Sequence, residues 1–321
     1  MDKVEISTTL ETLVGNIKPL DPFIDRDTTD SEREYFRYYG IDFEGQFPEV
    51  KHHFGSLKSA EYTIAVHYYE MKAADGTCLI VHGYYDHSGL YGRLIEYCLK
   101  RNLSVVICDL PGHGLSSGER ATIASFADYQ TVVTDVVEHF SLKAPRPWFA
   151  IGQSTGGAIL MDFLLSAREP VFSKTVLLAP LVKPVNWSSM GFLHSLAKVF
   201  ASKFARRFAE NSHDRHFLQF VKNDDPLQSR YLSVQWVTAL KQWINYFEHL
   251  RFVDYAPLII QGKEDQTVDW KYNVPAIEKK FPNSKLYYLK DGRHHLANES
   301  DTIMAISILQ WICTLTFSST E

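Results

Sequence analysis

Cysteine is scarce in this sequence of 321 residues, and its four cysteines are widely separated. Cys78, Cys98, Cys108 and Cys313 each lie in an apolar run, and no two of them form a C-x-x-C pair. Closely spaced pairs would be typical of a zinc site or a thioredoxin-like redox site. We therefore expect four small, buried hydrophobic side chains, with no metal and no cofactor.

Long apolar runs and a large excess of one charge are missing as well. No stretch of 18 uninterrupted apolar residues occurs, so the sequence offers no candidate for a membrane-spanning helix. Residues 1–10 do not have the charged-then-apolar layout of a signal peptide. The formal net charge of −5 gives no reason to expect nucleic-acid binding. We expect a cytoplasmic protein.

The composition and length fit a large globular unit with an inserted segment. An apolar content of 45% supplies enough material for a sizeable core. The N-terminal part shows no clear period, although residues 31–39 favour a short helix before Gly40. We divide the chain into an N-terminal extension (1–55), a core (56–182 and 251–321) and a helical cap (183–250).

Short β-rich runs alternate with helical segments from about residue 60. Seven strands are predicted, at Tyr62–Tyr69, Thr77–Val81, Ser104–Asp109, Trp148–Ile151, Thr175–Leu178, Leu258–Gln261 and Lys285–Leu289. Several are unbroken apolar runs, as expected for strands covered on both faces. Helices are predicted at about 89–101, 124–142, 156–167, 273–281 and 300–315. This alternation predicts an α/β fold, with a mostly parallel twisted sheet and helices on both faces.

The alternation stops between Pro180 and Pro257, where the sequence is mostly helical. One apolar stripe recurs every four residues and predicts an amphipathic helix: Phe192, Leu196, Phe200, Phe204 and Phe208. Because this insertion separates two core strands, we expect it to cap the carboxyl edge of the sheet, where open α/β sheets bind ligands.

The cap is basic and rich in aromatic residues. Residues 183–250 contain nine Lys and Arg against five Asp and Glu. One hypothesis is an apolar channel whose basic exterior, including Lys198, Lys203, Arg206 and Arg207, makes peripheral contact with anionic membranes. The alternative is a helix that packs on the core and exposes a solvated basic face.

The most informative motif is Gly152-Gln153-Ser154-Thr155-Gly156. It follows the apolar run 148–151 and opens a helical run, so the serine is expected at a sharp strand-to-helix turn with its hydroxyl exposed. Ser154 is therefore a candidate nucleophile. The alternative is a glycine-rich turn without chemistry, and only a base, an acid and oxyanion donors elsewhere decide between the two.

A serine hydroxyl needs an imidazole to take its proton and a carboxylate to orient that imidazole. The segment after the last predicted strand carries two candidate bases, His294 and His295. Asp265, just past an earlier strand end, is the candidate acid, with Glu264 and Asp269 as rivals. The order serine, acid, histidine is that of α/β-hydrolases and differs from the orders of chymotrypsin and subtilisin.

Two further loops follow predicted strands. His82-Gly83 indicates that the backbone amides of Tyr84 and Thr155 act as oxyanion donors, although the dipeptide alone could be an ordinary turn. The glycine-rich loop 109–118 lacks the lysine of a P-loop and the spacing of a dinucleotide fingerprint. We interpret this loop as a structural border of the site.

Together these motifs resemble a known family, the α/β-hydrolases that include monoacylglycerol lipases and bacterial L2-type lysophospholipases. The resemblance runs from about residue 60 to the C-terminus. It is carried by His82-Gly83 with Asp86-His87-Ser88-Gly89-x-Tyr91, by Asp109-x-x-Gly112-His113-Gly114-x-Ser116-x-Gly118, by Gly152-x-Ser154-x-Gly156-Gly157, by Gly262-x-x-Asp265-x-x-Val268 and by Arg293-His294-x-Leu296-x-Asn298-Glu299. In the cap, Asp224-Asp225-Pro226-Leu227 is similar to a motif of this family. The chain departs from the family at Gln153 and Thr155, where relatives often carry His and Met, and at the bulky Tyr84-Tyr85.

The resemblance implies a serine carboxylic ester hydrolase that acts through an acyl-enzyme on monoacylglycerol, lysophospholipid or related single-chain esters. Carried over by position, it implies Ser154 as nucleophile, Asp265 as acid, His294 as base, and Tyr84 and Thr155 as oxyanion donors. Two other functions share the fold. A prolyl-aminopeptidase-like enzyme would need an acid in the cap to hold the substrate's amino group, and a non-catalytic ligand-binding protein would not need the triad.

Overall fold

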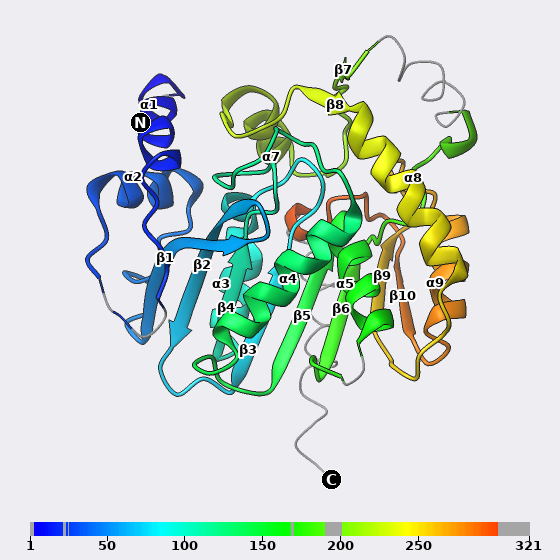
Figure 1. The fold of residues 1–321 in the computed structure, drawn as a ribbon, viewed down its shortest axis with the longest axis horizontal. Helices are drawn as coiled ribbons and strands as arrows, with labels where there is room; N and C mark the ends of the chain where they lie inside the picture. The colour runs from blue at the N-terminus through cyan, green and yellow to red at the C-terminus, as the bar shows by residue number, and fades with distance from the viewer. Residues whose placement is uncertain (1–2, 22–23, 25, 168–169, 190–200, 301–321) are drawn as a thin grey trace.

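An eight-stranded sheet forms the centre of the computed structural model, which describes residues 3–21, 24, 26–167, 170–189 and 201–300 (Figure 1). The strand order is β1-β2-β4-β3-β5-β6-β9-β10. The strands are β1 (Val50–Ser59), β2 (Tyr62–Met71), β3 (Gly76–Val81), β4 (Leu103–Cys108), β5 (Trp148–Gln153), β6 (Lys174–Leu178), β9 (Leu258–Gly262) and β10 (Lys285–Leu289). The β1–β2 and β2–β4 pairs are antiparallel, and every later pair in this order is parallel.

The seven predicted strands are confirmed as β2 to β6, β9 and β10, with ends shifted by no more than two residues. Strands β3, β4 and β5 are buried at every position, which explains why their sequences are continuous apolar runs. Strand β1 was not predicted. It pairs with β2 along its whole length, so the proposed boundary between residues 55 and 56 falls inside a strand of the sheet.

Helices cover both faces of the sheet. The near face in Figure 1 carries α4 (Phe126–Phe140), α5 (Thr155–Ser166) and α9 (Trp270–Lys280), and the far face carries α3 (Gly92–Leu99), which follows the 3₁₀ turn Ser88–Tyr91. Each face has its own hydrophobic core. These helices confirm four of the five predictions, and the fifth, at 300–315, lies outside the described residues apart from Ser300.

The N-terminal extension forms two helices, α1 (Lys3–Val14) and α2 (Asp30–Tyr39). Helix α2 was predicted, and it is capped at both ends. Thr29 and Glu32 form a capping box at its start, and Gly40 adopts a left-handed φ of 65° at its end. Buried side chains of α1 and α2 belong to the core on the α3 face. The extension therefore packs onto the domain.

The insertion contains more than helices. It forms β7 (Lys203–Ala205), the short helix α7 (Arg215–Gln219) with a π-helical turn (Phe220–Asp224), β8 (Tyr231–Ser233) and the long helix α8 (Val234–His249). The amphipathic helix predicted as far as Phe208 is wrong over Lys203–Ala205, which pairs antiparallel with β8. Long-range hydrogen bonds override the four-residue stripe there. Residues 190–200, the rest of that stripe, lie outside the described residues.

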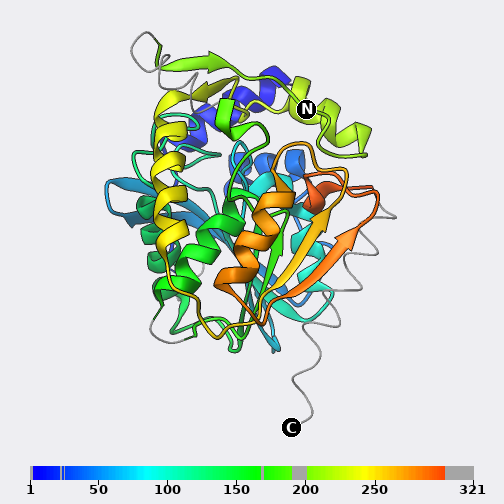
Figure 2. The same ribbon diagram turned by 90° about the vertical axis from the view of Figure 1, so that its right-hand side faces the viewer.

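The views in Figures 1 and 2 agree on where the insertion lies. The β7–β8 pair, α7 and the two N-terminal helices occupy one end of the molecule, while α8 runs down beside the near-face helices. This end is the one at which α5 begins, directly after β5. The β7–β8 pair and α7 thus lie at the carboxyl edge of the parallel strands, whereas α8 lies along the side of the domain.

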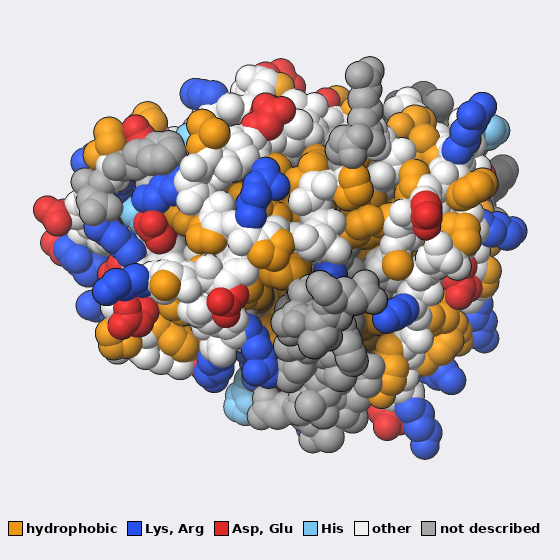
Figure 3. Space-filling view, turned by 90° about the horizontal axis from the view of Figure 1, so that it is seen from below, with side chains coloured by type: hydrophobic (Ala, Val, Ile, Leu, Met, Phe, Trp, Pro, Cys, Tyr) orange, Lys and Arg blue, Asp and Glu red, His pale blue; other side chains and the backbone are white. Residues whose placement is uncertain are grey.

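The opposite end shows no concentration of one charge. Lys, Arg, Asp and Glu side chains are interspersed over this face in Figure 3. Cys78, Cys98 and Cys108 are buried and unpaired as expected, whereas Cys313 lies outside the described residues. Among the described helices, none combines the length and apolarity that a membrane crossing requires.

Candidate active site

Ser154 stands at the sharp turn between β5 and α5. Its backbone adopts φ 53° and ψ −112°, a conformation that L residues rarely take. Its N–H donates to the carbonyl of Leu178, and its own carbonyl accepts from Ala158 and Leu181, at 2.9–3.1 Å. The turn is therefore held by hydrogen bonds on both sides, which can maintain the strained serine.

Close backbone contacts explain the two glycines of the motif. A Cβ on Gly152 would lie 2.6 Å from the carbonyl oxygen of Gly156, and one on Gly156 would lie 2.0 Å from the carbonyl oxygen of Val81. Side chains at these positions would force β5, α5 and β3 apart. The spacing G-x-S-x-G is thus a packing requirement of this turn.

The side chains of Ser154, His294 and Asp265 form one hydrogen-bonded chain. The Nε2 atom of His294 lies 3.0 Å from the Oγ of Ser154, and its Nδ1 lies 2.8 Å from an oxygen of Asp265. Because a carboxylate only accepts hydrogen bonds, Nδ1 carries the proton and donates to Asp265, which leaves Nε2 to accept from the serine hydroxyl. This is the tautomer that a general base requires.

Asp265 is buried, and its carboxylate is well supplied with donors. One oxygen accepts from the backbone N–H groups of Thr267 and Val268, and the other accepts from the side chain of Gln261 as well as from His294. Burial by itself would raise the pKa of Asp265, but the His294 ring and these hydrogen bonds outweigh it and hold the pKa below its ordinary value. The carboxylate is therefore charged at neutral pH.

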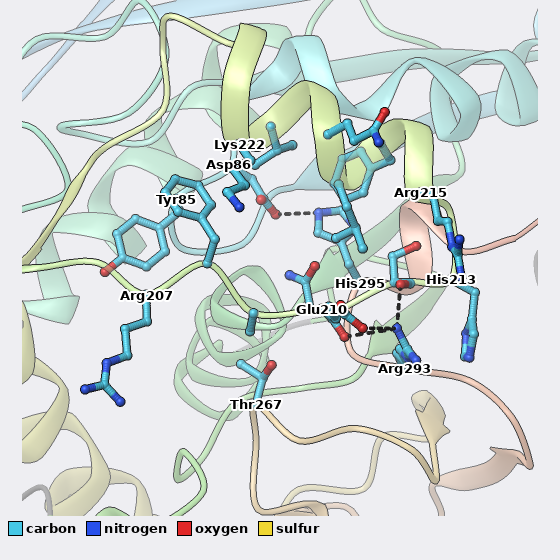
Figure 4. A pocket seen from close by; sticks show the side chains of 18 of the residues that line it. Tyr85, Asp86, Arg207, Glu210, His213, Arg215, Lys222, Thr267, Arg293 and His295 are labelled. Carbon is cyan, nitrogen blue, oxygen red and sulfur yellow. Dashed lines mark hydrogen bonds and ion pairs between the residues drawn. The ribbon is translucent and has the colours of Figure 1, made fainter.

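The rival residues make other contacts. His295 turns toward Asp86, with Nε2 3.1 Å from a carboxylate oxygen (Figure 4). Glu264 lies beside His213 at 3.3 Å, and Asp269 caps the start of α9. Of the candidate bases and acids, the structure brings only His294 and Asp265 to Ser154.

The two residues expected to supply oxyanion amides are Thr155, which follows the serine, and Tyr84, which follows Gly83. Neither Tyr84 nor Thr155 uses its backbone N–H in a hydrogen bond to any part of the chain that the structure describes. Thr155 begins α5, where the first N–H groups have no partner within the helix. Gly83 lies against the serine, since a Cβ on Gly83 would be 3.4 Å from the Cβ of Ser154.

The geometry of the loop after β3 depends on His82, which is fully buried. Its Nε2 accepts from the N–H of Leu110, 2.9 Å away, so its Nδ1 donates to the carbonyl of Gly83 at 2.8 Å. The ring thus links the ends of β3 and β4. The glycine-rich loop is tied similarly, with Asp109 accepting from the N–H groups of Ser88 and Leu115, both at 2.7 Å.

The cap contacts the oxyanion loop through an aromatic stack. The ring centroids of Tyr84 and of Trp236 in α8 are 3.7 Å apart, with an angle of 17° between the ring planes. The Tyr84 hydroxyl donates to the carbonyl of Ala121 at 2.7 Å. Sequence reasoning noticed the bulk of Tyr84 but could not detect Trp236, because the pairing residues are far apart in the chain.

Two adjoining cavities open beside this cluster. The larger, about 700 Å³, lies between the cap and the core loops and is bordered by Tyr85, Asp86, Lys222 and His295 (Figure 4). The second, about 570 Å³, is lined by Asp265 and His294, among others. The two share five lining residues, Ala209, Glu210, Asn211, Thr267 and Arg293. Ser154 lines neither and is 9% exposed.

The sheet, the strained serine at the end of β5 and the order serine, aspartate, histidine along the chain define an α/β-hydrolase fold. Comparison with known proteins agrees. The model of the family described as "Serine aminopeptidase, S33" matches residues 72–301, and the chain belongs to this family.

Among curated proteins, human monoglyceride lipase is 30% identical over 237 residues, which cover 68% of this chain and 75% of that protein. Phospholipase YtpA of Bacillus subtilis is 25% identical over 229 residues, covering 68% of this chain and 86% of the relative. A soluble variant of monoglyceride lipase from Saccharomyces cerevisiae shares the fold, with a TM-score of 0.70, 17% identity and coverage of 83% of this chain and 95% of that one. The chain is a carboxylic ester hydrolase of the α/β-hydrolase fold.

Proposed function

We propose that this protein hydrolyses single-chain lipid esters with Ser154 as nucleophile, His294 as base and Asp265 as acid. The observation that carries the proposal is the chain of hydrogen bonds from Ser154 through His294 to Asp265, at 3.0 and 2.8 Å. Names of relatives, monoglyceride lipase and phospholipase, support a lipid ester as the substrate class.

The geometry suits a two-step acyl transfer. Ser154 attacks the ester carbonyl while the Nε2 of His294 takes its proton, and the charged Asp265 stabilises the imidazolium. The oxyanion faces the free amides of Tyr84 and Thr155. His294 then protonates the leaving alcohol, after which it activates a water that releases the acyl group from Ser154.

A peptidase activity is less well supported, although the description of the family contains the word aminopeptidase. Such an enzyme needs an acid free to hold the substrate's amino group. The two acids that line the larger cavity are engaged, Asp86 with His295 at 3.1 Å and Glu210 with Arg293 at 3.6 Å. A purely ligand-binding role would not require the hydrogen bond between Ser154 and His294.

Turnover of p-nitrophenyl butyrate by the purified protein tests the proposal. Ser154→Ala should reduce kcat by about 10⁴-fold or more. Ser166→Ala, at the exposed end of the same helix, is the matched control and should retain activity. An active Ser154→Ala protein, or a wild type inactive on esters of every chain length, would contradict the proposal.

Peripheral contact of the cap with anionic membranes stays a prediction. Lys203 is paired with Glu119 at 2.7 Å, and Arg206 lines the cavity, so these two cations do not form a free outer face. Arg207 is exposed, and Lys198 lies outside the described residues. Reversing all four charges should abolish sedimentation with phosphatidylglycerol vesicles, and unchanged sedimentation would count against membrane contact.

A further inference from the structure

Arg206, in the cap, is a half-buried guanidinium without a carboxylate partner among the described residues. It lines the larger cavity. Its Nη1 donates to the side chain of Gln228 at 2.6 Å and to the carbonyl of Ser229 at 3.3 Å, both of them neutral acceptors. Burial lowers the pKa of Arg206, yet an arginine stays charged at neutral pH. The other guanidinium nitrogens of Arg206 form no ion pair with an acid in the part of the chain that the structure describes.

This guanidinium is held rigidly in place. It lies over the ring of Tyr85 at 3.8 Å and over the ring of Phe208 at 4.4 Å. Gln228, which accepts from it, donates in turn to the buried carboxylate of Asp225 at 2.9 Å. Asp225 is fixed to His87 of the core at 3.0 Å. A side chain positioned by stacking and by such a chain of contacts is preorganised for a ligand.

The wall around Arg206 carries a surplus of positive charge. Five Lys and Arg line this cavity against two Asp and Glu. Both acids are already paired, and of the cations only Arg293 has an acid partner. Within the described chain, Arg207, Arg215 and Lys222 form no ion pair. The cavity therefore favours an anion.

The cationic wall adjoins the reacting groups. Tyr85, on which Arg206 stacks, follows the oxyanion residue Tyr84, and His295 on the same wall follows His294. The second cavity, which His294 and Asp265 line, shares Arg293 and four other residues with the cationic one. Ser154 lines neither cavity, but its Oγ lies 3.0 Å from the Nε2 of His294, so we expect an ester attacked by Ser154 to extend its head group toward Arg206.

From these contacts we infer that the head group of the substrate is anionic: the enzyme acts on single-chain lipids that carry a phosphate, in preference to neutral monoacylglycerols, and Arg206 binds that phosphate. Arginine suits this role because its planar guanidinium pairs with two phosphate oxygens at once. The inference rests on the proposed ester hydrolysis at Ser154.

The test compares two substrates with the same octanoyl chain, lysophosphatidylglycerol and monooctanoylglycerol. The wild type should show a higher kcat/KM for the phospholipid. Arg206→Gln should lower the ratio of the two kcat/KM values by roughly 10- to 100-fold, the worth of a charge-assisted hydrogen bond. Arg206→Lys should lower the same ratio of kcat/KM values by a smaller factor. Arg251→Gln, an exposed cation near the end of the cap and absent from the cavity, should keep the wild-type ratio.

A wild-type ratio of one or less would overturn the inference, and so would an Arg206→Gln variant that loses both activities equally, since that indicates a structural role. Inorganic phosphate separates the two possible sources of the anion. It should inhibit phospholipid turnover competitively, whereas phosphate binding without phospholipid preference would assign the site to a free anion and refute the lipid inference.

A binding measurement separates this inference from the proposed function. The Ser154→Ala protein should bind octanoyl lysophosphatidylglycerol more tightly than the Ser154→Ala/Arg206→Gln protein, by about the same 10- to 100-fold in Kd. If the wild type hydrolyses no ester yet this difference in Kd appears, the proposed hydrolysis fails and the phosphate site stands. Equal Kd values would refute the phosphate site.

Discussion

The side-chain amide of Gln153 donates a hydrogen bond to the backbone carbonyl of His294 over 2.9 Å. Its oxygen accepts from the N–H of Ala297 at 3.3 Å. Gln153 precedes the serine of the turn and is 1% exposed, so this residue joins the β5–α5 turn directly to the histidine loop. Relatives often carry a histidine at position 153. In this chain the amide of Gln153 contacts the loop that carries His294, so this substitution affects how the base is positioned.

Replacing Gln153 by leucine should lower kcat by about 10-fold or more and change KM little. The variant leaves the N–H of Ala297 without its partner and removes one of the two donors to the His294 carbonyl, which should also cost about 1–3 kcal/mol of unfolding free energy. Urea denaturation and p-nitrophenyl butyrate kinetics measure the two effects. Gln153→His, which has both a donor and an acceptor nitrogen, should retain more stability. Equal kcat in all three proteins would contradict a positioning role for Gln153.

Asp265→Asn should reduce kcat by roughly 10⁴-fold, because an amide cannot hold His294 in the tautomer that accepts the serine proton. Glu264→Gln is the matched control. Glu264 is the neighbouring acid and is half exposed in its side chain, so this variant should stay within a few-fold of wild type. Comparable losses in the two variants would mean that the acid has been assigned to the wrong residue.

The buried pair of His87 and Asp225 should make stability depend on pH. Burial would lower the pKa of His87, but Asp225, with help from Asp109 and Asp86, raises it above its ordinary value. A raised histidine pKa stabilises the fold fully below about pH 6.5, the ordinary histidine pKa, and this contribution disappears as the pH rises through the raised value. Asp225 behaves in the opposite way. Burial would raise its pKa, His87 and hydrogen bonds lower it, and its contribution is lost in acid.

Asp225→Ala should therefore cost about 3–5 kcal/mol near pH 6, since it leaves a buried histidine without its partner. The loss should shrink as the pH rises through the raised pKa of His87, because His87 then becomes neutral in both proteins. Thermal unfolding of the wild type and of Asp225→Ala from pH 6 to pH 9 measures the gap in stability between the two proteins. A gap that is constant over this range would show that His87 does not titrate there.

Trp236→Ala should cost about 3–5 kcal/mol of unfolding free energy, because Trp236 is 5% exposed and packs in the core with Phe126 and Trp243 of the α4 and α8 helices. Loss of the stack on Tyr84 should also loosen the amide that we propose as an oxyanion donor and reduce kcat. Trp236→Phe should restore most of both quantities. Urea denaturation and kinetics measure the two effects. An alanine variant that lost stability but kept full kcat would contradict the link between the Trp236 stack and catalysis.

Sequence reasoning succeeded where the signal is local. Strands such as Leu103–Cys108 are covered on both faces and must be apolar along their length, so a continuous run identifies them. It failed for β1, whose buried positions include His52 and His53. These polar residues find partners across the fold, His52 with His67 at 3.0 Å and His53 with Glu70 at 2.8 Å. A window of sequence contains no sign of such partners.

The same division applies to the site. The sequence by itself determined that Ser154 sits between two obligatory glycines and that Asp265 and His294 follow strand ends in the order of an α/β-hydrolase, because these features depend on neighbouring residues and on the direction of parallel strands. Only the tertiary structure decided that Gln153 holds the His294 loop and that Arg206 lacks an acid partner within the described chain. These relationships depend on contacts between segments distant in the chain, which exist only after the cap has folded onto the sheet.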